Sequence, residues 1–270
     1  MTSELQENTD PKALLAWYVA MGADEAIDPD PVDRFAAMPA PTSPASTPPA
    51  QKPIIAGPTP VAVRPAQPVL GASTEDAVHA AAACKNLEEL AAALNAFDGG
   101  LLKRSAKNTV FADGTAGAPL MVVGDVPARE DDQTGKPFSG PAGELLDKML
   151  AAIGASRAES SYVTTLLPWR PLGNSKPDAN LLALCKPFVE RHIALADPKV
   201  VLLMGGAPGK ALFGTQDSIS RQRGRWQELA IGDQKFAAIA TYHPTYLISQ
   251  PHLKGAAWQD LLAAKDKLSS

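Results

Sequence analysis

The sequence contains only two cysteines, Cys84 and Cys185, among its 270 residues. So few thiols argue against a disulfide framework and against a four-cysteine metal site within the chain. A reducing cytoplasm is therefore the expected location. No run of 18 apolar residues is present, so neither a transmembrane helix nor a membrane partner is expected. The N-terminal stretch MTSELQENTDPK lacks the basic and apolar regions of a signal peptide.

The chain also has little net charge, −4 at neutral pH, which alone argues weakly against a nucleic-acid partner. The distribution is uneven, because residues 1–99 carry 5 basic and 13 acidic side chains, whereas residues 100–270 carry 20 and 16. The second part is therefore mildly positive. This excess permits binding to a polyanion without requiring it.

Composition divides the chain into three parts. Residues 1–28 have the pattern of a short amphipathic helix at 12–22, and this segment docks on the rest of the chain, is disordered or binds a protein partner. Residues 29–72 hold about half of the 25 prolines and are predicted to form an extended, disordered linker. Residues 73–270 carry the apolar patterns of a globular domain, which we expect to be a monomer.

Strand and helix patterns alternate from residue 119 onward. Short apolar runs predict the strands, and apolar residues at helical spacing predict the helices that follow them. The predicted pairs are strand 119–124 with helix 141–153, strand 161–167 with helix 178–195, strand 199–204 with a short helix near 207–213, and strand 236–242 with helix 253–268. Four such units predict an α/β fold, a three-layer α/β/α sandwich around a parallel sheet of about four strands. A further helix is predicted over 74–97, before a polar, Gly-rich segment at 98–118.

Polar residues gather where the predicted strands end, and parallel strands bring these ends to one edge of the sheet. The first strand leads into a loop that is either a ligand site or a solvated surface and that holds four acids, Asp125, Glu130, Asp131 and Asp132. The second strand end offers Thr165, and the fourth offers His243. The third, GGAPGK at 205–210, lacks the spacing of a phosphate-binding loop and is interpreted as a tight turn into a helix.

The ordered set GDVPAREDDQTGKPFSGPAG, YVTTLLPWRPLGN, CKPFVERHI and YHPTYLI resembles the uracil-DNA glycosylase superfamily, and most closely its family 4 branch of bacteria and archaea. The resemblance covers roughly residues 100–268 and does not reach residues 1–70. It implies a DNA repair enzyme that flips uracil, or a related deaminated base, out of DNA. Such an enzyme hydrolyses the N-glycosidic bond and leaves an abasic site.

The resemblance also implies roles for particular residues. Asp125 and Asp131 match acidic positions linked to water activation or oxocarbenium stabilisation, and each is one methylene shorter than the usual Glu. His243 matches a histidine near the uracil carbonyl. The substrate-binding positions are Gly124, Val126, Pro127, Ala128, Phe138 and Thr165, of which Phe138 matches the aromatic ring that stacks on the flipped base.

The loop 243–251 matches the segment that enters the DNA minor groove. This match assigns DNA contacts to four residues, Pro244, Thr245, Tyr246 and Leu247. The basic cluster at 221–225 is either a phosphate contact, with Arg223 as a candidate, or a solvated turn.

Two departures from the family pattern bear on function. Thr165 replaces the Asn that contacts the uracil edge, and a hydroxyl cannot form the paired contacts of an amide. Only Cys185 matches one of the four cysteines that bind the family's iron–sulfur cluster, and Trp169 occupies another position, so we expect no cluster and no other metal. Two alternatives stay open: a catalytically weak module that binds DNA or protein, and a glycosylase for another deaminated base such as hypoxanthine.

Overall fold

The computed structural model describes residues 71–270, so the predictions for residues 1–70 lie outside the described residues. Six strands form one sheet in the order β1-β3-β2-β4-β6-β5. They are β1 (Asp113–Gly114), β2 (Leu120–Gly124), β3 (Ser161–Thr165), β4 (Val200–Met204), β5 (Trp226–Ile231) and β6 (Gln234–Thr241). The four central strands are parallel, which confirms the predicted sheet. The antiparallel edge strands β1 and β5 were not predicted.

The four helices predicted after residue 119 are present, with ends that differ by at most one residue. The described helices are α2 (Thr74–Ala83), α3 (Leu87–Ala96), α4 (Gly100–Ser105), α5 (Arg129–Thr134), α6 (Pro141–Ala152), α7 (Ala179–Ala196), α8 (Gly206–Phe213), α9 (Ile219–Gln222), α10 (Pro244–Ser249) and α11 (Lys254–Ser269), with short 3₁₀ turns at Leu172–Asn174 and Pro251–Leu253. The single helix predicted over 74–97 is wrong. Cys84 adopts an extended conformation, and Asn86 caps a new helix by accepting a hydrogen bond from the Glu89 amide.

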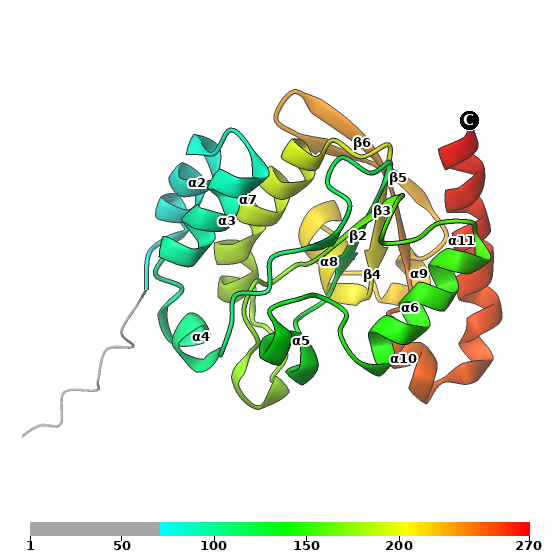
Figure 1. The fold of residues 1–270 in the computed structure, drawn as a ribbon, viewed down its shortest axis with the longest axis horizontal. Coiled ribbons are helices and arrows are strands. Elements are labelled where there is room, and N and C mark those ends of the chain that lie inside the picture. The colour runs from blue at the N-terminus through cyan, green and yellow to red at the C-terminus, as the bar shows by residue number, and fades with distance from the viewer. Residues whose placement is uncertain (1–70) are drawn as a thin grey trace, which may run out of the picture. The chain divides into compact units, whose positions relative to one another are not determined.

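Helices cover both faces of the sheet (Figure 1), which confirms the three layers. Side chains alternate along β2, so Met121 and Val123 pack into the core under α2, α3 and α7. Leu120 and Val122 pack into the opposite core with α6 and α11. Because the four central strands are parallel, their carboxyl ends emerge at one edge of the sheet. There, two segments predicted as loops contain the short helices α5 and α10.

Residues 71–270 contain no helix able to span a membrane. None of the helices in that range combines the length and the apolar character that a bilayer crossing requires.

Candidate active site

A cleft of about 490 Å³ lies beside the carboxyl ends of β2, β3 and β6. This volume is within the range of small-molecule sites. The lining residues are Asp125, Val126, Pro127, Ala128, Arg129, Glu130, Asp131, Phe138, Ala142, Thr165, His243 and Thr245. Residues predicted from three separate strand ends therefore meet around one cavity. The cleft also includes Glu130, which the sequence placed in the acidic loop without a role of its own, and Arg129 and Ala142, which were not predicted.

Asp125 directly follows β2, and its carboxylate lies against the start of α8. Its Oδ1 accepts a hydrogen bond from the Ala207 amide at 3.0 Å. A Cβ atom at Gly205 would lie 2.2 Å from Oδ2, so the close approach of this carboxylate requires glycine there. Burial raises the pKa of Asp125 to about 6, although the bond from Ala207 acts in the opposite direction. A carboxylate tuned in this way is suited to accept a proton near neutral pH.

Asp131 is directed toward the backbone of its own loop. Its Oδ2 accepts a hydrogen bond from the Ala128 amide at 3.0 Å, and its Oδ1 accepts one from the Ser139 amide at 2.7 Å. Burial nevertheless raises the pKa of Asp131 above its ordinary value. The adjacent Asp132 accepts from the amide of Lys107 at 2.7 Å. These contacts favour a positioning role for Asp131 over the direct catalytic role that the resemblance implies.

His243 lies two residues after the end of β6 and caps α10. The Thr245 amide donates a hydrogen bond to its Nδ1 at 3.2 Å, so the neutral ring carries its proton on Nε2. Burial lowers the pKa of His243 to about 4, which keeps the imidazole neutral at physiological pH. The ring therefore presents a neutral N–H donor at the cleft.

Phe138 forms the aromatic wall of the cleft and is held in a rare backbone conformation, with φ of 52°. Its ring stacks on His243, with ring centroids 5.1 Å apart. A Cβ atom at Gly124 would lie 2.6 Å from the ring, so the predicted role of Gly124 becomes a packing role beneath Phe138. The Phe138 carbonyl accepts a hydrogen bond from Arg157 at 2.9 Å, a residue to which sequence analysis gave no role.

Thr165 is the last residue of β3 and contributes an apolar surface to the cleft. Its hydroxyl donates to the Leu167 carbonyl at 2.7 Å in a buried hydrogen bond. Its Cγ2 methyl lies 3.5 Å from the position of a Cβ atom at Gly124. The hydroxyl is thus committed to the backbone, which leaves a methyl group where the family pattern has an amide.

The residues assigned to DNA contact differ in their exposure. Leu247 is 1% exposed and Pro244 is buried, so both belong to the core, whereas Tyr246 is 45% exposed. Thr245 is also exposed, and so is Ile248, at 47%, which was not among the predicted site residues. The outer face of α10 therefore consists of Thr245, Tyr246, Ile248 and Ser249.

Arg223 has a structural environment that the sequence did not indicate. Its guanidinium donates to both oxygens of Asp260, at 3.0 and 2.6 Å, and Asp260 also accepts the Thr241 hydroxyl at 2.7 Å. Asp260 is 1% exposed, so this arginine balances a buried charge. Arg221 and Arg225 are the exposed members of the same cluster. Of this cluster, these two residues are therefore the ones whose side chains meet solvent.

The residues near the family's cluster positions do not fit an iron–sulfur centre. Both cysteines are buried and free, and no group of three or more metal-binding side chains is found over residues 71–270. The Trp169 side chain is 1% exposed and donates from Nε1 to the Thr109 hydroxyl at 3.0 Å. A Cβ atom at Gly99 would lie 2.7 Å from its ring. An indole therefore packs against the segment that precedes β1.

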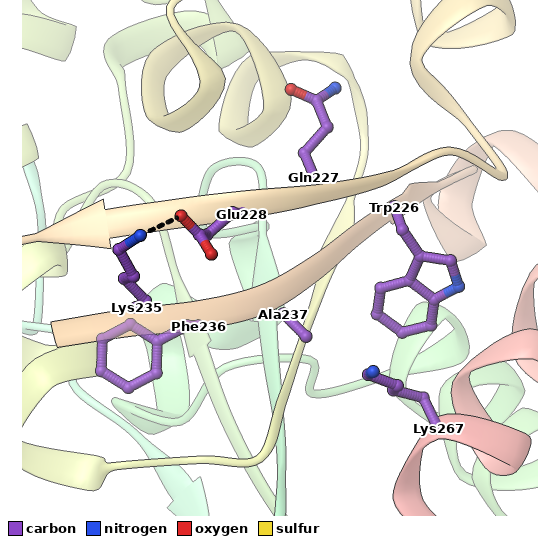
Figure 2. Close-up of a pocket in the computed structure, with 7 residues that line it drawn as sticks. All are labelled: Trp226, Gln227, Glu228, Lys235, Phe236, Ala237 and Lys267. Atoms are coloured by element: carbon purple, nitrogen blue, oxygen red, sulfur yellow. Dashed lines mark ion pairs between the residues drawn. The ribbon is translucent and has the colours of Figure 1, made fainter. Parts of the chain in front are cut away.

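A second cavity, of about 510 Å³, lies at the antiparallel edge of the sheet. Figure 2 shows its lining by residues of β5 and β6 together with Lys267 from α11. Its carboxylate, Glu228, forms an ion pair with Lys235 at 2.8 Å. The carboxylate of this cavity is thus already paired, and its other charged group, Lys267, is a cation. Unlike the first cleft, its lining has no histidine beside an acid.

Comparison with known proteins gives a consistent result. Residues 111–262 match the family described as Uracil DNA glycosylase superfamily. A Type-4 uracil-DNA glycosylase of Saccharolobus solfataricus is 30% identical over 168 residues, which cover 61% of this chain and 78% of that protein. A Type-4 uracil-DNA glycosylase of Archaeoglobus fulgidus is 33% identical over 57% of this chain and 78% of its own length. One of Thermotoga maritima is 34% identical over 52% of this chain and 72% of its own length.

Proposed function

Because the chain belongs to the uracil-DNA glycosylase superfamily, we propose that it hydrolyses the N-glycosidic bond of uracil in DNA and leaves an abasic site. The observation that carries this proposal is the convergence of Asp125, Phe138 and His243 on one cleft at the sheet edge. A base inside a duplex must first be extruded, which costs a few kcal/mol of unstacking. The exposed Tyr246 and Ile248 on α10 are suited to contact the opened duplex.

Each cleft residue has a distinct task in the proposed reaction. Phe138 stacks on the flipped pyrimidine, and the Nε2–H of His243 donates to a uracil carbonyl. As the bond between the sugar and the base N1 breaks, the bonding electrons leave with the base and the uracil becomes an anion. The His243 donor stabilises that negative charge.

The sugar becomes cationic as the base departs, and water supplies the new bond to the anomeric carbon. The Asp125 carboxylate stabilises the cation and accepts the proton that the attacking water loses. Its pKa of about 6 is compatible with both tasks, because the group is ionised at neutral pH and still basic. Asp131 supports this reaction indirectly, since its two oxygens hold the loop that contains Ala128 and Ser139.

A second substrate is favoured by one specific observation, the apolar contact surface of Thr165. Without an amide at this position, the cleft discriminates less strongly between uracil and other bases, because a hydrogen-bond donor and acceptor that match the base edge provide most of such selectivity. Hypoxanthine in DNA is the alternative substrate. A panel of oligonucleotides that carry uracil or hypoxanthine distinguishes the two substrates by alkali cleavage after incubation.

We also propose that the chain functions without an iron–sulfur cluster, since a four-thiolate site requires more cysteines than the two present. The packing of Trp169 on Gly99 and its bond to Thr109 support this view. Iron analysis and visible absorption spectra of protein purified with and without oxygen are the test. A stoichiometric iron–sulfur absorption band would overturn it.

The decisive test of function is release of uracil by the full-length chain from single-stranded, U·G and U·A substrates. We expect strand cleavage after alkali treatment, strongest for single strands and U·G, where unstacking is least costly. Inactivity on all three would reject the uracil assignment. DNA binding that does not depend on uracil and releases no base would instead favour a catalytically weak binding module.

A further inference from the structure

One arginine outside the cleft holds the loop that carries Phe138. Arg157 lies in the turn between α6 and β3, and its side chain is 14% exposed. Its Nη2 donates to the Phe138 carbonyl at 2.9 Å and to the Gly143 carbonyl at 3.3 Å. Its Nη1 donates to the Pro137 carbonyl at 3.1 Å. A single guanidinium thus joins two consecutive carbonyls of this loop to the first turn of α6.

The backbone conformation of Phe138 directs its carbonyl to an enclosed position beside Arg157. A φ of 52° is uncommon for a residue other than glycine and directs the Phe138 carbonyl toward α6. A Cβ atom at Gly143 would lie 1.7 Å from that carbonyl oxygen and 3.0 Å from Nη2 of Arg157. The carbonyl is therefore enclosed by the glycine and the guanidinium, and its only described hydrogen-bond donor is Arg157.

Two carboxylates fix the guanidinium itself. Arg157 Nε donates to Asp147 at 2.6 Å, and Nη1 lies 3.4 Å from Asp113. The Arg157 carbonyl accepts from the Thr115 hydroxyl at 3.3 Å. The planar fork of arginine serves all these acceptors at once, which the single ammonium of lysine cannot do.

We propose that Arg157 is a positioning residue for base release. It fixes the Phe138 backbone so that the ring remains packed against Gly124 and His243 in the wall of the cleft that a flipped base would enter. Arg157 does not line the cleft, so its effect passes through Phe138. The catalytic consequence rests on the function proposed above, whereas the structural consequence for the Phe138 ring does not.

The kinetic test compares R157A, F138A and the R157A/F138A double variant in single-turnover release of uracil. We expect R157A to slow release by about 10- to 100-fold, because small misplacements of a substrate-orienting group have effects of this size. The double variant should be no slower than F138A, since both changes remove the same interaction. Affinity for DNA that contains an abasic site should change by less than about twofold, because that ligand has no base to stack.

The matched control is T115A, which removes the hydroxyl contacts with the Arg157 and Ala158 carbonyls and leaves the guanidinium contacts intact. This variant should release uracil at the rate of the unchanged protein. R157K keeps the charge and covers the case in which R157A fails to fold. It should fall between R157A and the unchanged protein. Independent, additive losses in R157A and F138A would overturn the proposal.

A second measurement needs no activity. Fluorinated phenylalanine labels all seven Phe residues, and comparison with F138L identifies the Phe138 resonance in the ¹⁹F spectrum. We expect R157K to shift or broaden that resonance and T115A to leave it unchanged. An unaltered Phe138 resonance in R157K would reject the positioning role. If neither the unchanged protein nor any variant released uracil, the proposed function would be rejected. The ¹⁹F spectrum would then still decide whether Arg157 positions Phe138.

Discussion

The ring of Phe138 lies against the imidazole of His243, with centroids 5.1 Å apart and ring planes inclined by 22°. The two residues follow β2 and β6, which are separated in the sheet by β4. The aromatic surface of the cleft and its N–H donor are therefore one packed unit. A change that moves either ring is expected to affect both stacking and hydrogen bonding with the base.

Replacing His243 by Ala should reduce uracil release by about 10²- to 10³-fold, because the donor acts on charge that develops as the base leaves. Single-turnover rates with saturating enzyme measure this step directly. The matched control is H252A, since His252 is exposed and lies outside the cleft. Equal rates for H243A and the unchanged protein would remove His243 from the mechanism.

The pH dependence of uracil release should show one acidic limb near pH 6. Asp125 must be ionised to accept a proton, and burial raises its pKa to about 6, so activity should fall as the pH drops below this value. His243 should add no limb in this range, because burial lowers its pKa to about 4. A rate profile from pH 4.5 to 9 tests both statements. A limb that persists in D125N would assign it to another group.

Replacing each of the cleft acids Asp125 and Asp131 by its amide should separate catalysis from stability. D125N should slow release by about 10²-fold or more, as expected for loss of a proton acceptor. D125N should also stabilise the fold relative to the unchanged protein, and by more at pH 8 than at pH 5. Folding raises the pKa of Asp125 from 3.8, so the carboxylate costs stability as the pH rises through about 6.

D131N should reduce the stability of the fold more than it reduces the rate of uracil release. The amide of Asn keeps one acceptor oxygen, so one of the two backbone amides that Asp131 binds loses its partner. Leaving such a group unsatisfied costs about 1–3 kcal/mol, which should appear as a lower midpoint in thermal unfolding. The rate per folded molecule should change less than in D125N. A D131N variant that is stable but inactive would restore Asp131 to a direct catalytic role.

The arginines of the 221–225 cluster should have separate effects. R223A leaves the buried carboxylate of Asp260 without its partner and should destabilise the fold by about 3–5 kcal/mol. R221A should leave stability nearly unchanged, because the side chain is 76% exposed. It should weaken DNA binding and reduce its salt dependence, as expected for a lost phosphate contact. Chemical denaturation and binding titrations at several salt concentrations measure the two effects.

Removing the buried indole should test the packing of Trp169 on the segment that precedes β1. W169A should cost about 3–5 kcal/mol, the usual effect of truncating a buried aromatic residue. W169F should cost less and report mainly the hydrogen bond to Thr109. W258F is the control, since Trp258 is 40% exposed. A tolerated W169A, with the stability of the control, would show that the segment before β1 is held by other contacts.

Much of the domain could be predicted from local sequence. The apolar runs of β2 and β4 and the helical spacing of α6, α7 and α11 are signals carried by neighbouring residues. The order of strand and helix then brings the strand ends to one edge. For this reason the sequence predicts that Asp125, Thr165 and His243 lie near one another. The family resemblance added Phe138 by its place in a motif.

Contacts between distant segments decided the remaining features. Arg157 reaches the Phe138 carbonyl, Arg223 reaches Asp260, and the Asp131 oxygens face amides on both sides of α5. No local pattern marks these partners, because a guanidinium or carboxylate has the same sequence signature whether it is solvated or paired. The sequence by itself determined which elements form and where their ends meet. Only the tertiary structure decided which charged groups remain free for chemistry, because burial and pairing depend on the packing of the whole domain.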